Sequence, residues 1–189
     1  MSVDSVLKEN GILEMEGHCG QVFAQQIALA GLVLPRGIDR VMEIGFNAGH
    51  SAELFLSIRS DTTVTSFDLG AHRYVQACKE EIDRQFPGRH TLVLGDSAVT
   101  VPDYVPEAPF DLIFVDGDHS YLGAQADLRN CARLARKGTI VVMDDTDMPE
   151  VFRAWKEANE AGLVREMCVL RFNLGGSLCR AMSWGMYLL

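Results

Sequence analysis

Four aspartates follow directly on two apolar runs of the chain, where acidic side chains could bind a cation or move a proton. Asp116 and Asp118 come after one run, and Asp144 and Asp145 come after the next one. Carboxylates crowded together repel one another unless they share a cation or a proton. Because oxygen ligands suit Mg²⁺, Ca²⁺ or Mn²⁺ better than zinc, we expect a divalent-cation site at Asp116, Asp144 and Asp145.

A glycine turn follows an earlier apolar run, Arg40–Ile44. Gly45 and Gly49 are four residues apart, and a helix is expected to begin at His50. Glycine lacks a β-carbon, so a ligand can approach the backbone there, and a helix N-terminus favours negative groups. The G-x-G-x-x-G fingerprint of dinucleotide-binding folds is absent. The turn therefore predicts a ligand-binding loop without the glycine that approaches a pyrophosphate.

Acidic residues also follow the second and third apolar runs. Asp68 comes after Phe67, where an acid can accept hydrogen bonds from two ribose hydroxyls. Asp96, Ser97 and Ala98 follow the third run, where an acid and small residues could hold an adenine edge. Open α/β sheets bind ligands at the carboxyl ends of their strands. We therefore expect these loops and the four aspartates to lie along one edge of a sheet.

Five short apolar runs predict the strands of that sheet. Their starts lie 21 to 28 residues apart, which leaves room for one strand, one helix and two loops. Runs that are apolar throughout suit strands covered on both faces. The pattern predicts an α/β fold, with a parallel sheet and helices on both faces. The expected strands are Arg40–Ile44, Thr63–Phe67, His90–Leu94, Asp111–Val115 and Thr139–Met143.

Stop signals and apolar periodicity mark the helices. The expected helices are His18–Leu34, His50–Arg59, Tyr74–Phe86, Leu122–Ala135, and a last one from the N-cap Asp147 to about Ala161. Near the end, Val164–Leu174 and Ser177–Leu189 are β-prone and joined by Gly175-Gly176, which is typical of an antiparallel hairpin. We expect a single domain over residues 1–189, with a helical cover over residues 1–38 and a cofactor-binding core over residues 39–189.

The composition is that of a soluble globular domain. The 189 residues carry 17 Lys and Arg against 26 Asp and Glu, a formal net charge of −9, and 48% are hydrophobic. Binding to a phosphate backbone depends on Lys and Arg, so a nucleic-acid partner is not expected. No apolar run approaches the roughly 18 residues of a membrane span, so a membrane is not expected either. The five cysteines include no C-x-x-C pair, which favours a reduced, cytoplasmic protein.

The motifs between Arg40 and Asp145 together resemble those of class I S-adenosylmethionine-dependent methyltransferases. They are E-I-G-x-x-x-G, F-D after the second run, G-D-S after the third, F-D-L-I-F-V-D-G-D-H-S-Y and G-T-I-V-V-M-D-D. Within this class, the chain is similar to bacterial small-molecule O-methyltransferases of the catechol/caffeoyl-CoA and macrolide- or aminocoumarin-sugar types. The resemblance implies a Rossmann-like, doubly wound sheet of seven mostly parallel strands, whose antiparallel seventh strand inserts between the fifth and sixth.

The resemblance also implies residue roles. S-adenosylmethionine would contact Glu43, Gly45, Phe46, Asn47, Gly49, Ser51, Asp68, Asp96, Ser97, Ala98 and Asp116. The ligands of the metal-dependent members correspond to Asp116, Asp144 and Asp145, although the last ligand is commonly Asn in the catechol and caffeoyl types. His119 falls where related enzymes carry a catalytic lysine or histidine, and Asp118 is a competing base.

The expected reaction is metal-assisted methylation of a hydroxyl on a small molecule. A hydroxyl is a poor nucleophile until it is deprotonated; a divalent cation lowers its pKa, and a histidine with a pKa of about 6.5 can take the proton. Two alternatives stay open. One is an NAD(P)-dependent oxidoreductase, against which the missing G-x-G counts, and the other is a non-catalytic cofactor-binding domain. His18 could reach the acceptor pocket, and the apolar end Met186–Leu189 could pack in a homodimer.

Overall fold

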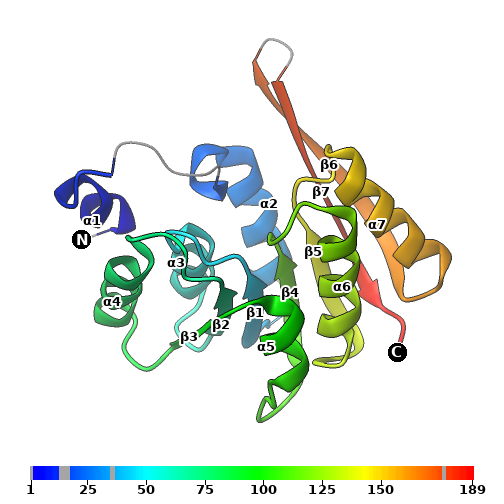
Figure 1. Ribbon diagram of the computed structural model, residues 1–189, viewed down its shortest axis with the longest axis horizontal. Helices are drawn as coiled ribbons and strands as arrows, with labels where there is room; N and C mark the ends of the chain where they lie inside the picture. The colour runs from blue at the N-terminus through cyan, green and yellow to red at the C-terminus, as the bar shows by residue number, and fades with distance from the viewer. Residues whose placement is uncertain (1, 13–17, 35–36, 176–177) are drawn as a thin grey trace.

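The computed structural model describes residues 2–12, 18–34, 37–175 and 178–189. Seven strands form one sheet in the order β3-β2-β1-β4-β5-β7-β6 (Figure 1). The first five strands are parallel, which confirms the predicted α/β sheet. The strands are β1 (Arg40–Ile44), β2 (Thr63–Asp68), β3 (His90–Leu94), β4 (Phe110–Val115), β5 (Ala135–Met143), β6 (Val164–Gly175) and β7 (Leu178–Tyr187).

Helices cover both faces of the sheet, as predicted. Apolar side chains of the first four α-helices share one buried cluster, and those of the last three share a second cluster on the other face. The central strands β1 and β4 carry apolar residues toward both clusters, which is why their sequences are apolar throughout. The helices are α1 (Val3–Glu9), the 3-10 turn η1 (Cys19–Gln21), α2 (Phe23–Val33), α3 (His50–Ile58), α4 (Val75–Gln85), α5 (Ser97–Asp103), α6 (Tyr121–Ala132) and α7 (Pro149–Glu160).

The last two strands run against each other, which confirms the predicted hairpin. β7 pairs antiparallel with β5 on one side and with β6 on the other, so the last strand lies between the fifth and the sixth. Gly175 of the predicted link belongs to β6 and pairs with Leu178, whereas Gly176 of the link and Ser177, the expected start of the second strand, lie outside the described residues.

Two predicted details of the second half of the chain are wrong. The helix expected to reach Ala135 ends at Ala132, because Ala135 already pairs with Phe110 at the start of β5. The expected N-cap Asp147 does not cap α7, since Met148 holds that position. The Asp147 carboxylate instead accepts a hydrogen bond of 2.7 Å from the backbone N–H of Ala181 in β7.

The N-terminal segment differs from the single helix expected over His18–Leu34. Val22 has a backbone conformation outside the helical region, which separates η1 from α2. Leu29 and Val33 of α2 are fully buried in the same cluster as α3 and α4. The division into a helical cover over residues 1–38 and a core over residues 39–189 stays a prediction. Among the described residues, no helix is long and apolar enough to cross a membrane.

Candidate active site

The glycine turn after β1 is shaped by its neighbour at the end of β4. Gly45 has a φ of +96°, and a β-carbon there would overlap the backbone carbonyl oxygen of Asp116. Gly49 has a φ of +82°, and its β-carbon would lie 2.8 Å from the ring of Phe46. Both positions therefore require glycine, for their backbone conformation and for space. The result is a close-fitting turn that leads into the N-terminus of α3.

Asp68 at the end of β2 fixes the same turn from the side. Its two carboxylate oxygens accept hydrogen bonds from the backbone N–H groups of Asn47, at 2.8 Å, and Gly70, at 2.7 Å. The Tyr74 hydroxyl donates to the side-chain oxygen of Asn47 at 2.6 Å, a contact that the sequence did not indicate. A carboxylate oxygen can accept more than one hydrogen bond, so Asp68 keeps acceptor capacity for a ligand hydroxyl.

Glu43 lies fully buried under the turn. Its carboxylate accepts a hydrogen bond of 2.6 Å from Ser66, whose hydroxyl oxygen lies 2.7 Å from His90 Nε2. Burial raises the pKa of Glu43 to about 7, although the hydroxyls of Ser51 and Ser66 oppose this shift. Burial also lowers the pKa of His90 to about 4. Glu43 is therefore part of the floor of the site and not a surface acid.

The loop after β3 directs its polar side chains toward helices. Asp96 caps α5 by accepting a 2.8 Å hydrogen bond from the N–H of Ala98. The Ser97 hydroxyl donates at 2.7 Å to Asp127 of α6, whose pKa burial raises to about 6. Asp96 and Ala98 remain exposed, so a ligand along this edge can reach them.

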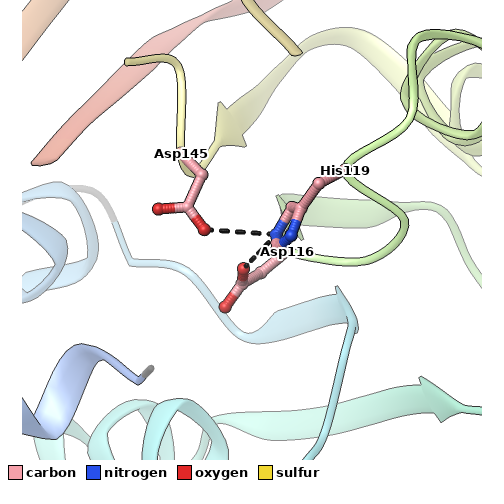
Figure 2. A group of neighbouring side chains, drawn as sticks. All are labelled: Asp116, His119 and Asp145. Atoms are coloured by element: carbon pink, nitrogen blue, oxygen red, sulfur yellow. Dashed lines mark ion pairs between the residues drawn. The ribbon is translucent and has the colours of Figure 1, made fainter. Parts of the chain in front are cut away.

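Three side chains meet where β4 and β5 end (Figure 2). His119 Nε2 lies 3.1 Å from Asp145 Oδ2 and 3.7 Å from Asp116 Oδ1. Asp145 has a φ of +50°, a left-handed conformation that Asp tolerates better than most residues. One potential ligand atom of each residue lies within 4.8 Å of the others. The adjacency of β4 and β5 thus brings Asp116, His119 and Asp145 into one cluster at the predicted edge.

Asp144 is not one of the three residues of this cluster. It is 2% exposed, and its Oδ2 accepts a 2.7 Å hydrogen bond from the side-chain amide of Gln25 in α2. Arg180 of β7 approaches both neighbouring acids, at 2.8 Å from Asp145 Oδ1 and 3.5 Å from Asp144 Oδ2. Sequence reasoning missed Gln25 and Arg180. No local motif marks them, because each comes from an element whose place is set by long-range packing.

The contacts of His119, Asp144 and Asp145 raise the pKa of some of these groups and lower that of others. Hydrogen bonds to Asp116 and Asp145 raise the pKa of His119 to about 10, so the ring carries a proton at neutral pH in this arrangement. Burial raises the pKa of Asp145, but the contacts with His119 and Arg180 outweigh it and hold the pKa below its usual range. Burial, with the nearby Asp116 and Asp145 charges, raises the pKa of Asp144 to about 8.

Asp118 lies apart from the cluster. Its carboxylate accepts hydrogen bonds from the backbone N–H of Ser120 at 2.8 Å and from the Ser120 hydroxyl at 2.9 Å. It also lies against Gly123 in the first turn of α6. Of the two bases considered from the sequence, His119 is therefore the one that lies beside Asp116 and Asp145.

A second histidine lies beside the glycine turn. The ring of His18 stacks on His50 with a centroid distance of 3.6 Å, and His50 Nε2 lies 3.0 Å from Asp4 of α1. Burial lowers the pKa of His18 to about 4, so it is neutral at pH 7. A cavity of about 20 Å³ lies here, lined by His18, Cys19, Gly45, Phe46, Asn47, Ala48, His50, Ser51 and Asp116.

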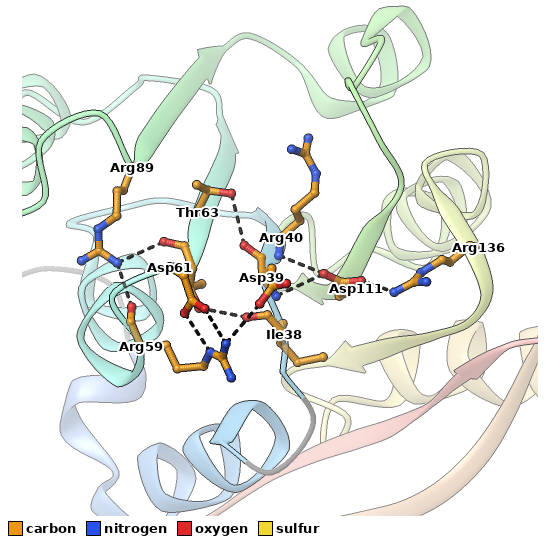
Figure 3. A network of polar contacts seen from close by, with 10 residues as sticks. Ile38, Asp39, Arg40, Arg59, Asp61, Thr63, Arg89, Asp111 and Arg136 are labelled. Carbon is orange, nitrogen blue, oxygen red and sulfur yellow. Dashed lines mark hydrogen bonds and ion pairs between the residues drawn. The ribbon is translucent and has the colours of Figure 1, made fainter.

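The opposite edge of the sheet carries a different kind of polar network (Figure 3). Asp111 accepts hydrogen bonds from the backbone N–H of Arg40 at 3.0 Å and pairs with Arg136. Arg59 pairs with Asp61 at 2.6 Å. A cavity of about 410 Å³ lies beside Arg136. These charges tie strand starts together at the amino ends, whereas open α/β sheets bind ligands at the carboxyl ends.

Comparison with known proteins points to one class. The profile of a family described as "Methyltransferase domain" matches residues 42–146, which is more than half of the chain. A comparison with curated proteins found no match. An O-methyltransferase from Bacillus cereus, solved in complex with SAH, has a TM-score of 0.77 and 19% identity, over 98% of this chain and 90% of that one.

A second solved structure is similar over the whole chain. TomG from Streptomyces achromogenes is an O-methyltransferase involved in tomaymycin synthesis and was solved in complex with SAM. It has a TM-score of 0.75 and 16% identity, over 99% of this chain and 88% of that one. At these identities the two structures show a shared fold.

Proposed function

Because this chain belongs to the methyltransferase-domain family, we propose that it transfers the methyl group of S-adenosylmethionine to a hydroxyl oxygen of a small molecule. The observation that carries the proposal is the alignment of the glycine turn, Asp68 and the cluster of Asp116, His119 and Asp145 along one carboxyl edge. This edge is where α/β sheets hold a cofactor and its substrate.

The cofactor is proposed to lie across the ends of β1, β2 and β3. The turn from Gly45 to Gly49 would border its methionine part, with Glu43 and Ser51 beneath. Asp68 would accept hydrogen bonds from the ribose hydroxyls. Asp96, Ser97 and Ala98 would border the adenine. The similarity to structures solved with SAH and SAM supports this placement.

The reaction would take place beside His119. The acceptor oxygen forms a bond to the methyl carbon as the carbon–sulfur bond breaks, which turns the sulfonium into a neutral thioether. The hydroxyl proton passes to the carboxylate of Asp116, because the ring of His119 already carries a proton. The positive ring of His119 would stabilise the developing negative charge on the oxygen. Holding oxygen, carbon and sulfur in line supplies the rest of the rate.

The divalent cation expected from the sequence is not part of this proposal. Both carboxylate oxygens of Asp145 already pair with nitrogen cations, Oδ1 with Arg180 and Oδ2 with His119. Asp144 Oδ2 already accepts a hydrogen bond from the Gln25 side-chain amide, and Asp144 lies outside the cluster. This donor set does not fit a resident metal ion, so no step of the reaction is assigned to one.

The partner is proposed to be a small molecule. The formal net charge of −9 supports this against a nucleic-acid acceptor, whose phosphates would be repelled. The five cysteines are free, which agrees with the reduced, cytoplasmic setting that we infer. A homodimer through Met186–Leu189 stays a prediction.

Calorimetric titration of the full chain with S-adenosylmethionine, S-adenosylhomocysteine and NAD tests the cofactor. We expect binding of the first two and none of NAD, and Asp68→Asn should weaken S-adenosylmethionine binding at least about tenfold, which is about 1.4 kcal/mol. Asp61→Asn is the matched control, since Asp61 pairs with Arg59 at the opposite edge. Binding of NAD instead of the sulfonium would favour the oxidoreductase.

Turnover is tested separately with the radiolabelled methyl donor and a panel of phenols and sugars that carry free hydroxyls. Label recovered in an O-methyl group of an acceptor supports the proposal. Tight binding of the cofactor without transfer to any hydroxyl in the panel would favour the non-catalytic cofactor-binding domain.

A further inference from the structure

A cationic side chain lies beside two of the three acids that the sequence assigned to a divalent cation. The guanidinium of Arg180 contacts Asp145 Oδ1 through Nε at 3.1 Å and through a terminal nitrogen at 2.8 Å. The same terminal nitrogen lies 3.5 Å from Asp144 Oδ2. A charge-assisted contact of this kind is among the stronger hydrogen bonds in proteins.

The fold fixes Arg180 in this position. Its neighbour Ala181 donates its backbone N–H to Asp147 at 2.7 Å and accepts the N–H of Thr146 at 2.8 Å. The loop after β5 is therefore joined to β7 directly beside the arginine. The Arg180 side chain is only 15% exposed, so it has little freedom to leave the acids.

Three of the six carboxylate oxygens that the sequence offers to a metal ion are already held at 3.1 Å or less, whereas the buried Asp144 Oδ1 has no hydrogen-bond partner among the described residues. Asp145 pairs through both oxygens, with Arg180 and with His119, and Asp144 Oδ2 accepts from Gln25. Mg²⁺ demands a nearly ideal octahedron of oxygen ligands at about 2.0–2.1 Å. To bind, an ion would have to displace the guanidinium of Arg180 and remain next to it, against its repulsion.

We propose that Arg180 takes the place of the divalent cation, so that this site binds no metal and, given the function proposed above, methylates its acceptor without one. An arginine stays protonated at every physiological pH and supplies a fixed positive charge beside the acids. Its charge balances one of the carboxylates and leaves Asp116 and His119 to meet the acceptor oxygen. An acceptor then needs only a single hydroxyl, since no metal is present for two neighbouring oxygens to chelate.

Electron paramagnetic resonance of free Mn²⁺ tests this on the full chain without any turnover. We expect no binding by the wild type up to ~1 mM, the range of weak carboxylate sites. Arg180→Gln frees the acid oxygens and should bind Mn²⁺ at least about tenfold more tightly, a gain of about 1.4 kcal/mol. The double variant Arg180→Gln with Asp145→Asn should lose that gain.

Two control variants separate the loss of a positive charge at residue 180 from the loss of a positive charge elsewhere on the protein. Arg180→Lys keeps a cation at the site and should behave as the wild type. Arg165→Gln removes one positive charge from an exposed position of β6 and should also leave Mn²⁺ binding unchanged.

Two results would overturn the proposal. One is wild-type protein that binds Mn²⁺ as tightly as Arg180→Gln, and this needs no folded variant. The other is Arg180→Gln that melts like the wild type yet gains no affinity. S-adenosylmethionine titrations of the same samples test the proposed function separately from the metal proposal. A wild type that binds no S-adenosylmethionine rejects the proposed function and leaves the Mn²⁺ comparison intact.

Discussion

The buried carboxyl of Glu43 should make the free energy of unfolding fall as the pH rises from about 5 to about 8. Its pKa is about 7 in the folded chain, against 4.5 for an unperturbed glutamate. The folded state therefore binds a proton that the unfolded state releases, and this stabilising contribution is present below the unfolded pKa. It is lost as the pH rises through the folded pKa.

The magnitude follows from the shift of 7 − 4.5, or 2.5 units. At 1.36 kcal/mol per unit the full effect is about 3 kcal/mol, of which about 2.5 kcal/mol is lost between pH 5 and pH 8. Glu43→Gln keeps an acceptor for the Ser66 hydroxyl but cannot ionise. The variant should therefore gain about 2.5 kcal/mol relative to the wild type over that range.

Urea denaturation of both proteins at the two pH values measures this difference. His18 and His90 have lowered pKa values, so their contributions to the free energy of unfolding rise with pH, opposite to that of Glu43. These contributions are the same in both proteins and cancel when the variant is compared with the wild type. Glu81→Gln is the matched control: Arg84 lowers the pKa of Glu81, so its effect should be nearly equal at both pH values. A Glu43→Gln effect that is also independent of pH would refute the reasoning.

Three further predictions concern the turn and the cluster. Gly45→Ala forces a β-carbon onto the Asp116 carbonyl oxygen at a φ of +96°. The free energy of unfolding should fall by about 1–3 kcal/mol, and the melting temperature by several degrees. The variant should also show no S-adenosylmethionine binding in titration. His119→Gln should lower kcat about 100-fold and leave the cofactor Kd unchanged. Asp118→Asn should lower kcat less than about threefold, because the Asp118 carboxylate already accepts hydrogen bonds from Ser120. Equal losses of kcat for the two variants in steady-state assays would contradict the assignment of His119. Removal of divalent cations with EDTA should leave turnover unchanged, and a rate restored only by added Mg²⁺ would contradict the metal-free site.

The sequence predicts the parts of the site that depend on single strands and their ends. Asp68 and Asp116 terminate apolar runs, so their place at the carboxyl edge follows from the alternation of strands and helices alone. His119 and Asp145 join Asp116 because β4 and β5 are neighbours, which the order of a parallel fold makes predictable. The direction of a side chain within a loop is not predictable in this way. That is why the sequence could not decide between His119 and its neighbour Asp118 as the candidate base.

The same limit explains the errors in the local elements. Asp147 has the residue type of an N-cap, but its carboxylate binds the backbone of Ala181, a contact 34 residues away in the chain. The basic residues Arg136 and Lys137 with Gly138 suggest the end of a helix, yet Ala135 and Phe110 already form a strand pair. In both cases a distant partner outweighs a local preference, and no pattern within the segment contains that partner.

The charge that Arg180 brings to the site depends on strand register. β7 pairs with β5 so that Met143 lies opposite Ser183, and Met182 and Trp184 face the cluster that includes α2. Successive side chains of a strand point to opposite faces, so a slip of one residue would send Arg180 to the other face and leave Asp145 without its cation. The burial of Met182 opposes that slip. The contact of Arg180 with Asp144 and Asp145 is thus specified by the apolar pattern of the last strand, far along the chain from the motif that contains the two acids.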